Sequence, residues 1–161
     1  MPAPTVAVEQ PVLTSAPRRF VLYRHRIVAQ RDLPATLSDT FGELYAHIGT
    51  IGAVPGGPPF VIYHDSSVRG VRWEVDICAP VSAPITAPPG FEYLEMASGI
   101  VVSLLHVGPY ETLGGAYEAI ERYIVEHGLH PAGPPREFYY SEPSVPPSET
   151  RTLIERPVSE P

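Results

Sequence analysis

An internal repeat constrains the fold of this chain more than any other feature of its sequence. The segment from Gly52 to Pro59 reads G-x-x-P-x-G-P-P, and the segment from Gly128 to Pro135 reads the same. The offset is 128 − 52 = 76 residues, and apolar residues upstream match at the same offset. The matched pairs are Leu37 with Leu113, Phe41 with Tyr117, Leu44 with Ile120 and Ile48 with Ile124. A repeat of this kind predicts two copies of one supersecondary unit.

Each copy has the pattern of a strand, a helix and two further strands. Alternating or continuous apolar residues indicate the strands, and apolar residues at helical spacing indicate the helix. In the first copy the expected elements are strands over 20–29, 60–64 and 71–78, a helix over about 35–49 and a hairpin turn over 65–70. In the second copy they are strands over 100–107, 136–141 and 150–156 and a helix over 113–127 that Gly128 ends.

The predicted fold class is therefore α+β. Two tandem, pseudo-symmetric β-α-β-β modules each form an antiparallel sheet with one long helix, and a cleft lies between them. We expect a flexible N-terminus over 1–17, one domain over 18–158 and a short tail over 159–161. The first copy occupies about 20–81 of that domain and the second about 91–158.

Composition narrows the possible partners. With 11 basic and 18 acidic residues the formal net charge is −7, which disfavours direct binding of nucleic acid despite a local arginine cluster between Arg18 and Arg31. No apolar run approaches the ~18 residues of a membrane span, and the first ten residues lack a secretory signal pattern. The single cysteine, Cys78, is typical of a reducing compartment. We expect a cytoplasmic protein without membrane partners.

The strand over 136–140 carries the clearest candidate site. Alternation places Glu137 and Tyr139 on one face and Phe138 and Tyr140 on the other. A carboxylate beside aromatic rings suits a lipophilic cation, because the charge pairs with the carboxylate and the rings attract the cation. A surface salt bridge from Glu137 explains the local sequence equally well.

Several segments together resemble a known family. They are His106-Val-Gly-Pro-Tyr-Glu111, Gly133-Pro134, Glu137-x-Tyr139 and Thr152-x-Ile-x-x-Pro-Val158. This combination is similar to the GyrI-like family, also called AraC-type or bacterial transcription activator effector-binding domains. The resemblance implies a ligand cleft between two modules, with Glu137 facing cationic aromatic drugs. It also implies a stand-alone member, because only about 19 residues precede the first expected strand. The first copy has Val61 where the second has Glu137.

Five aromatic residues complete the candidate ligand site. Tyr63 is the repeat mate of Tyr139, and we expect both to line the cleft. Trp73 is equally consistent with a pocket wall and a core plug. Packing on the sheet is the better interpretation for the repeat mates Phe41 and Tyr117, and Tyr110 is expected at the rim. The expected ligand-binding set is thus Glu137, Tyr139, Trp73, Tyr63, Tyr110, Tyr117 and Phe41.

The expected function is binding of a hydrophobic, often cationic small molecule in multidrug sensing, sequestration or resistance. The alternative is a hydrolase that opens the cyclopropane of DNA-alkylating toxins, with Glu137 as general base and Tyr139 as hydrogen-bond donor. A gyrase-inhibitor-like module that binds a protein is the third possibility. No cofactor is expected. No metal site is expected either, because Gly128 separates His127 from His130 and no further ligand completes a set.

Overall fold

The structure, a computed structural model, describes residues 10–64, 72–142 and 144–161. The chain divides into two compact units. We call residues 17–98 the first unit, and residues 99–161 together with the segment that ends at Ala16 the second unit. The hairpin turn expected over 65–70 lies outside the described residues.

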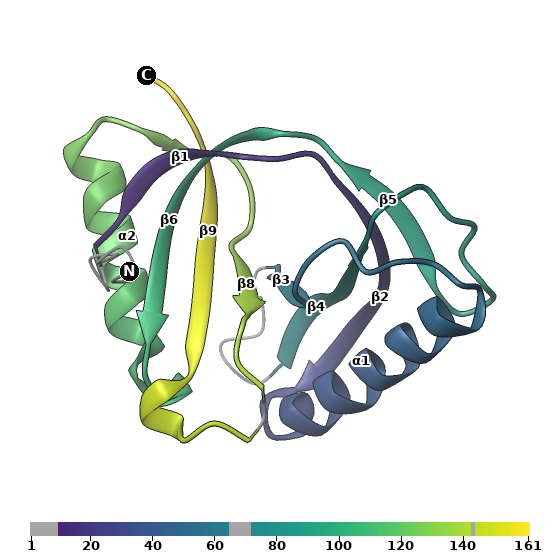
Figure 1. The fold of residues 1–161 in the computed structure, drawn as a ribbon. Helices are drawn as coiled ribbons and strands as arrows, with labels where there is room; N and C mark the ends of the chain where they lie inside the picture. Colours follow the sequence, from purple (N-terminus) through teal and green to yellow (C-terminus); the bar gives the residue numbers. More distant parts are fainter. Residues whose placement is uncertain (1–9, 65–71, 143) are drawn as a thin grey trace, which may run out of the picture. The chain divides into compact units, whose positions relative to one another are not determined.

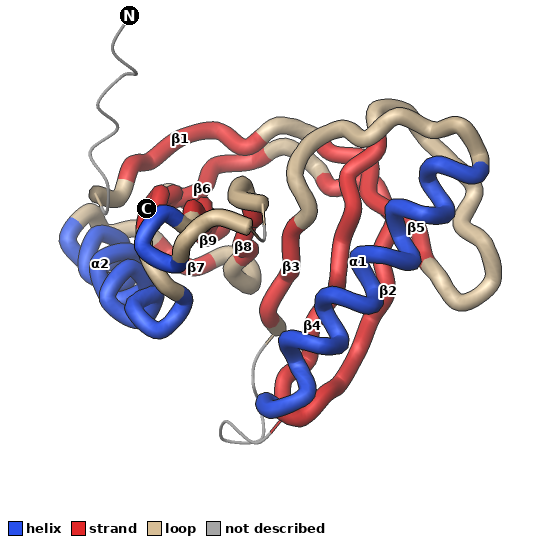
Figure 2. The backbone as a smooth tube through the Cα atoms, turned by 60° about the horizontal axis from the view of Figure 1, so that its bottom comes forward, coloured by secondary structure: helices blue, strands red, loops and turns tan. Residues whose placement is uncertain are grey.

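The first unit is an antiparallel four-stranded sheet with one helix. The strand order is β3-β4-β2-β5, and α1 contacts β2 and β4, running across them in Figure 2. Pro34 near the helix start and Gly52, with φ of 70° just after its end, mark the limits of α1. The elements are β2 (Arg19–Ala29), η1 (Gln30–Asp32), α1 (Leu33–Thr50), β3 (Phe60–Tyr63), β4 (Arg72–Val81) and β5 (Glu92–Met96).

The second unit repeats this plan. Its strand order is β1-β6-β9-β8, with β7 also paired to β9, and α2 contacts β6 and lies beside it in Figure 1. Gly128, with φ of 65°, stands at the position of Gly52 after the helix. The elements are β1 (Val12–Ala16), β6 (Gly99–Val107), η2 (Tyr110–Thr112), α2 (Leu113–Glu126), β7 (His130–Pro131), β8 (Arg136–Tyr139), η3 (Pro147–Glu149) and β9 (Arg151–Ser159).

The core of the second unit lies between α2 and one face of its sheet. The apolar stripe of the helix, Leu113, Ala116, Ile120 and Ile124, is buried against strand residues that include Leu104 and Ile154. Residues that pair across an antiparallel ladder point to the same face. Because Glu137 pairs with Ile154, which in turn pairs with Leu104, Glu137 lies on the helix-covered face.

The same registers recur in the two units, which confirms the duplication. Val21 pairs with Pro80 in the first unit, and Val101 pairs with Pro157 in the second. Likewise Val61 pairs with Ile77, and Glu137 pairs with Ile154. The G-x-x-P-x-G-P-P segment has one structural role in both copies: Gly56 donates its backbone N–H to the Pro80 carbonyl at 2.9 Å, and Ala132 donates to Pro157 at 2.8 Å.

The two helices differ by one turn, so a single offset of 76 does not describe the whole repeat. The helices begin at Leu33 and Leu113, an offset of 113 − 33 = 80, while the glycines that follow them keep the offset of 76. The difference equals the four residues that separate the 18-residue α1 from the 14-residue α2. Aligning the two copies at the offset of 76 pairs Leu37 with Leu113. The longer helix has a leucine at its first residue, Leu33, and another one turn later at Leu37, so the apolar pattern does not reveal the extra turn.

The expected flexible N-terminus over 1–17 is wrong in part, because β1 occupies Val12–Ala16 and pairs with β6 of the second copy. Its counterpart β5 precedes the second copy and pairs with β2 of the first. The two copies therefore exchange their leading strands. Both strands are short, β1 is largely exposed and β5 has no buried residue, and for this reason their hydrophobic pattern is weak.

The basic segment expected between Arg18 and Arg31 is partly neutralised. Arg18 pairs with Glu95 at 2.8 Å, and Arg24 pairs with Glu43 of α1 while its guanidinium stacks on Phe91. Among the described residues, neither helix is both long and apolar enough to cross a membrane.

Candidate functional site

The side chain of Glu137 is the centre of the candidate site. It projects from β8 onto the helix-covered face of the second unit, and the residue is only 7% exposed. Tyr117 of α2 donates its hydroxyl to Oε2 of Glu137, and Tyr139 donates to Oε1 at 3.0 Å. Both carboxylate oxygens therefore accept a hydrogen bond from a phenol.

Burial shifts the pKa of this carboxyl. It raises the pKa of Glu137 above its ordinary value, and the hydrogen bonds from Tyr117 and Tyr139 oppose that rise only in part. In the described part of the chain, no arginine pairs with Glu137, and the sequence contains no lysine. The site thus offers a buried acid whose negative charge is solvated by hydroxyls alone.

Tyr110 places a second ring beside Tyr139. Their centroids lie 6.1 Å apart in an edge-to-face arrangement, at an interplanar angle of 82°. Tyr110 is 55% exposed and sits in η2 just before α2. Its partial burial, and secondarily the charge of Glu137, raise the pKa of its phenol. The exposure of Tyr110 is consistent with the rim position expected from the sequence, and its role in ligand binding stays a prediction.

The equivalent position of the first unit is apolar. Val61, completely buried, stands where Glu137 stands, and Phe41 of α1 stands where Tyr117 stands. Tyr63 packs edge-on against Trp73, with the ring centroids 5.7 Å apart.

The structure therefore brings together four of the seven residues expected to bind ligand and groups the other three in the first unit. Glu137, Tyr139, Tyr117 and Tyr110 form one contiguous cluster. The interpretation of Tyr117 as only a packing residue misses its hydrogen bond to Glu137. Trp73, Tyr63 and Phe41 belong to the first unit. The ligand-binding role of all seven, and the cleft between the copies, stay predictions.

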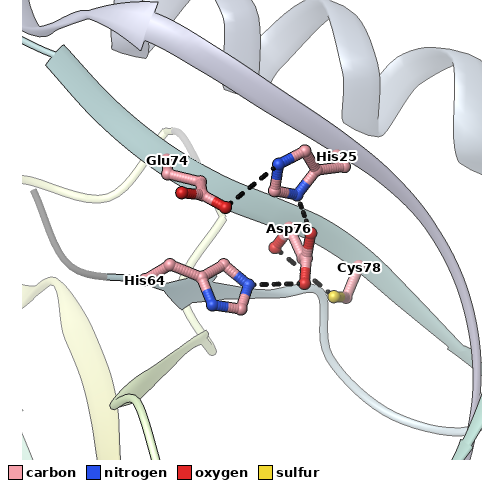
Figure 3. Close-up of polar contacts among 5 residues, drawn as sticks. All are labelled: His25, His64, Glu74, Asp76 and Cys78. Carbon is pink, nitrogen blue, oxygen red and sulfur yellow. Dashed lines mark hydrogen bonds and ion pairs between the residues drawn. The ribbon is translucent and has the colours of Figure 1, made fainter. Parts of the chain in front are cut away.

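The opposite faces of the two sheets differ as well. In the second unit Arg136 pairs with Glu155 there, at 3.6 Å. In the first unit, Asp76 contacts two histidines: His25 Nδ1 lies 2.6 Å from Oδ1, and His64 Nε2 lies 2.7 Å from Oδ2 (Figure 3). Arg24 reaches Glu43 of α1, so the next residue along β2, His25, points to the face opposite the helix.

Sequence reasoning missed this cluster of His25, His64 and Asp76. The three residues come from three strands, and only the register of β2, β3 and β4 brings them together. The only local signal is the alternation of Glu74, Asp76 and Cys78 on one face of β4 in a strand whose other face is apolar.

Two kinds of chemistry fit the Glu137 cluster. An ionised carboxylate flanked by aromatic rings attracts an apolar cation, since the ring faces and the carboxylate all carry negative potential. A carboxyl with a raised pKa, next to phenols that donate hydrogen bonds, is also suited to proton transfer. Both uses need the same atoms.

Comparison with known proteins identifies the fold. The model of a family described as "GyrI-like small molecule binding domain" matches residues 10–159. No curated protein matches the sequence significantly. The EcmrR chain in its complex with DNA superposes with a TM-score of 0.83 at 22% identity over 94% of this chain, which spans 58% of EcmrR. The isolated EcmrR C-terminal domain gives a TM-score of 0.78 at 22% identity, with 94% of this chain and 98% of that domain covered.

Two further solved structures share the fold at lower identity. A hydrolase from Listeria innocua gives a TM-score of 0.69 at 16% identity, with 94% of this chain and 93% of that chain covered. SAV2435 bound to tetraphenylphosphonium gives 0.62 at 12% identity, with 93% and 94% covered. At such identities these likenesses show a common fold.

Proposed function

Because the chain belongs to the GyrI-like small molecule binding domain family, we propose that it binds a lipophilic cation carrying aromatic rings, with Glu137 meeting the positive charge. The observation that carries the proposal is the buried carboxylate held by Tyr117 and Tyr139. The corresponding cellular role is to sense or sequester compounds of this class, or to confer resistance to them.

The energetics of Glu137 favour a cationic ligand over a neutral one. Taking a carboxylate out of water is costly unless a positive charge compensates it. The phenols of Tyr117 and Tyr139 satisfy its hydrogen bonds but bring no charge. A bound cation supplies the missing charge without needing hydrogen-bond donors of its own, which matches quaternary phosphonium and ammonium compounds.

The neighbouring rings add affinity for the same ligands. Tyr139 and Tyr110 present aromatic surface beside the carboxylate, and a cation near a phenol ring gains about 0.5–2 kcal/mol. A protein of the same fold, SAV2435, is known with tetraphenylphosphonium bound. That cation is therefore a suitable first probe for this protein.

The test is calorimetric titration of tetraphenylphosphonium and of neutral triphenylphosphine oxide into the parent protein and Glu137→Gln. Losing the ion pair should weaken binding of the cation by about 2–4 kcal/mol, roughly 30- to 1000-fold. The neutral compound should bind both proteins nearly equally, since the amide preserves the shape of the site.

The control is Glu126→Gln, which makes the same chemical change at an exposed position of α2. It should bind the cation as the parent does. An equal loss for the two probes in Glu137→Gln would mean damaged geometry, and an unchanged affinity for the cation would remove Glu137 from the site.

A hydrolase that opens strained, electrophilic rings is the second candidate. The raised pKa of Glu137 beside two phenolic donors favours it, and a Listeria innocua protein of this fold is a hydrolase. Glu137 would take a proton from water, and Tyr139 would donate a hydrogen bond to the developing charge. Product analysis with a cyclopropane-bearing alkylator discriminates the two: turnover that disappears in Glu137→Gln while binding persists would establish the enzyme.

A further inference from the structure

We infer that His25, His64 and Asp76 form a binding site for a divalent transition-metal ion such as Zn²⁺, on the face of the first unit's sheet opposite α1. Their ligand atoms lie within 4.8 Å of one another. The three residues come from adjacent strands β2, β3 and β4, so the sheet itself fixes their spacing. This site shares no residue with the Glu137 cluster and has no part in the function proposed above.

The first argument is the donor set. Imidazole nitrogen and carboxylate oxygen are the ligands that Zn²⁺ and its first-row neighbours take, and two histidines with one carboxylate leave a coordination position for water. Asp76 directs one oxygen at each ring, at 2.6 Å from His25 Nδ1 and 2.7 Å from His64 Nε2 (Figure 3). One ligand atom from each of the three residues can therefore reach the same small volume.

The second argument is the partner of the outer nitrogen of His25. Its Nε2 lies 3.2 Å from Oε2 of Glu74. A carboxylate that accepts the outer N–H of a ligating histidine fixes the tautomer and turns the other nitrogen's lone pair toward the metal. Glu74 and Asp76 stand two residues apart on β4, so both point to this face.

The third argument is the pair of carboxylates around the His25 ring. Both of its ring nitrogens face carboxylate oxygens, Nδ1 toward Asp76 and Nε2 toward Glu74. When the Nε2–H of a neutral imidazole is directed at Glu74, the lone pair of Nδ1 faces the Asp76 carboxylate, and a metal ion between these two is a group that both can bind.

The geometry needs only side-chain adjustment to accept an ion. Bonds of about 2.0–2.2 Å in tetrahedral geometry place ligand atoms about 3.3 Å apart, between the shortest contact of 2.6 Å and the limit of 4.8 Å. The side chains of His25 and His64 are 40% and 33% exposed and have room to turn, while that of Asp76 is 11% exposed. An ion can enter from the solvent side.

The test is calorimetric titration of Zn²⁺ into chelator-treated protein, with Co²⁺ absorption as a second readout. We expect one ion per chain and a d–d spectrum of four-coordinate Co²⁺ that Zn²⁺ abolishes. His25→Gln and His64→Gln should each weaken Zn²⁺ binding by more than about 100-fold, and Glu74→Gln by about 10-fold, as outer partners of metal ligands do. Zn²⁺ should raise the Tm of the parent and not of the histidine variants.

Two controls define the site. His130→Gln removes an exposed histidine of β7, and Cys78→Ser removes the thiol that donates to the Asp76 carbonyl at 3.4 Å. Both should keep the parent affinity. Because Asp76 is buried and its replacement can unfold the chain, the conclusion rests on the two more exposed histidines. No Zn²⁺ uptake by the parent would overturn the inference. Uptake that survives both histidine variants, or that is lost in Cys78→Ser, would overturn it as well.

Discussion

On the helix-covered face of the second unit, Glu137 lies buried beneath Tyr117, whereas Val61 and Phe41 occupy the same positions of the first unit. On the face opposite the helix the contrast reverses. There the first unit holds His25 and Asp76, and the second holds Leu105 and Leu153 at the matching positions of the shared register. The two copies thus share one backbone arrangement. The Glu137 cluster lies on the helix-covered face of the second unit, and the cluster of His25 and Asp76 lies on the opposite face of the first.

This comparison teaches that the duplicated register, rather than the duplicated side chains, is what the two copies share. A ladder position sets which strands a residue contacts and which face it joins. It does not determine which type of side chain occupies that position. Exchanging residues between equivalent positions therefore tests whether a function belongs to the position or to its neighbours.

The largest expected effect comes from Val61→Glu, which places a carboxylate in the first unit at the position of Glu137. Val61 is fully buried and Phe41 supplies no hydroxyl there, so the charge lacks the partners that Tyr117 gives. The free energy of unfolding at pH 7 should fall by about 3–5 kcal/mol. Urea denaturation followed by circular dichroism measures it.

The double variant Val61→Glu with Phe41→Tyr is the matched control. A phenol at position 41 should recover about 1.5–3 kcal/mol through a hydrogen bond to the charged group. If the double variant is no more stable than the single one, the two copies differ in more than the residues at these positions.

A smaller effect is expected from Tyr117→Phe, which makes the second unit resemble the first. Oε2 of Glu137 would lose its donor while remaining buried, so the variant should be less stable by about 1–3 kcal/mol at pH 7. The pKa of Glu137 should rise further, because a hydrogen bond that favours the charged form is gone. Stability curves at several pH values separate the two effects. A variant as stable as the parent at every pH would show that the hydroxyl does not support the carboxylate.

The pH dependence of Glu137→Gln gives an effect near 1 kcal/mol. Since burial raises the folded-state pKa of Glu137 above its unfolded value, its contribution to stability is full below the unfolded pKa and is lost as the pH rises through the folded pKa. The variant should therefore gain up to about 1 kcal/mol over the parent at pH 7. That gain should vanish near pH 4. Thermal melts of both proteins across this range decide it, and a gain that persists at pH 4 would contradict the assigned cause.

The smallest effect belongs to Tyr110. Its exposed hydroxyl can be removed in Tyr110→Phe with a change in stability within about 0.5 kcal/mol. Removing the ring in Tyr110→Ala should weaken tetraphenylphosphonium binding by about 0.5–1 kcal/mol, as expected for an exposed cation–π contact. Calorimetry measures the affinity of both variants for tetraphenylphosphonium. If Tyr110→Ala binds as tightly as Tyr110→Phe, the ring makes no contribution and Tyr110 is excluded from the ligand site.

Local pattern predicted much of the fold and half of the Glu137 cluster. Alternation along 136–140 placed Glu137 and Tyr139 on one face, and the two side chains do contact each other. The contact of Glu137 with Tyr117 was beyond this reasoning, because it depends on where α2 crosses the sheet. A tyrosine in an apolar stripe looks the same whether its hydroxyl meets solvent or a buried acid.

The histidine cluster could not be predicted from local sequence patterns. His25, His64 and Asp76 carry no motif, and a shift of one residue in the pairing of β2 with β4 would turn His25 away from Asp76. The strands β1 and β5 were missed for a related reason, since their pairing with the other copy has no trace in the local pattern.

The exchange of leading strands has a consequence for the order of folding. Residues 17–98 form a continuous segment inserted into a unit whose own parts lie on both sides of it. During synthesis the inserted unit can complete its sheet as soon as β5 leaves the ribosome, whereas β1 must wait for β6, since Val12 pairs with Ser103. Contacts between residues so distant in sequence form slowly. The strand β1 therefore leaves the ribosome before the inserted unit but can pair only after β6 has followed, and until the two strands pair, β6 presents an open edge to other chains.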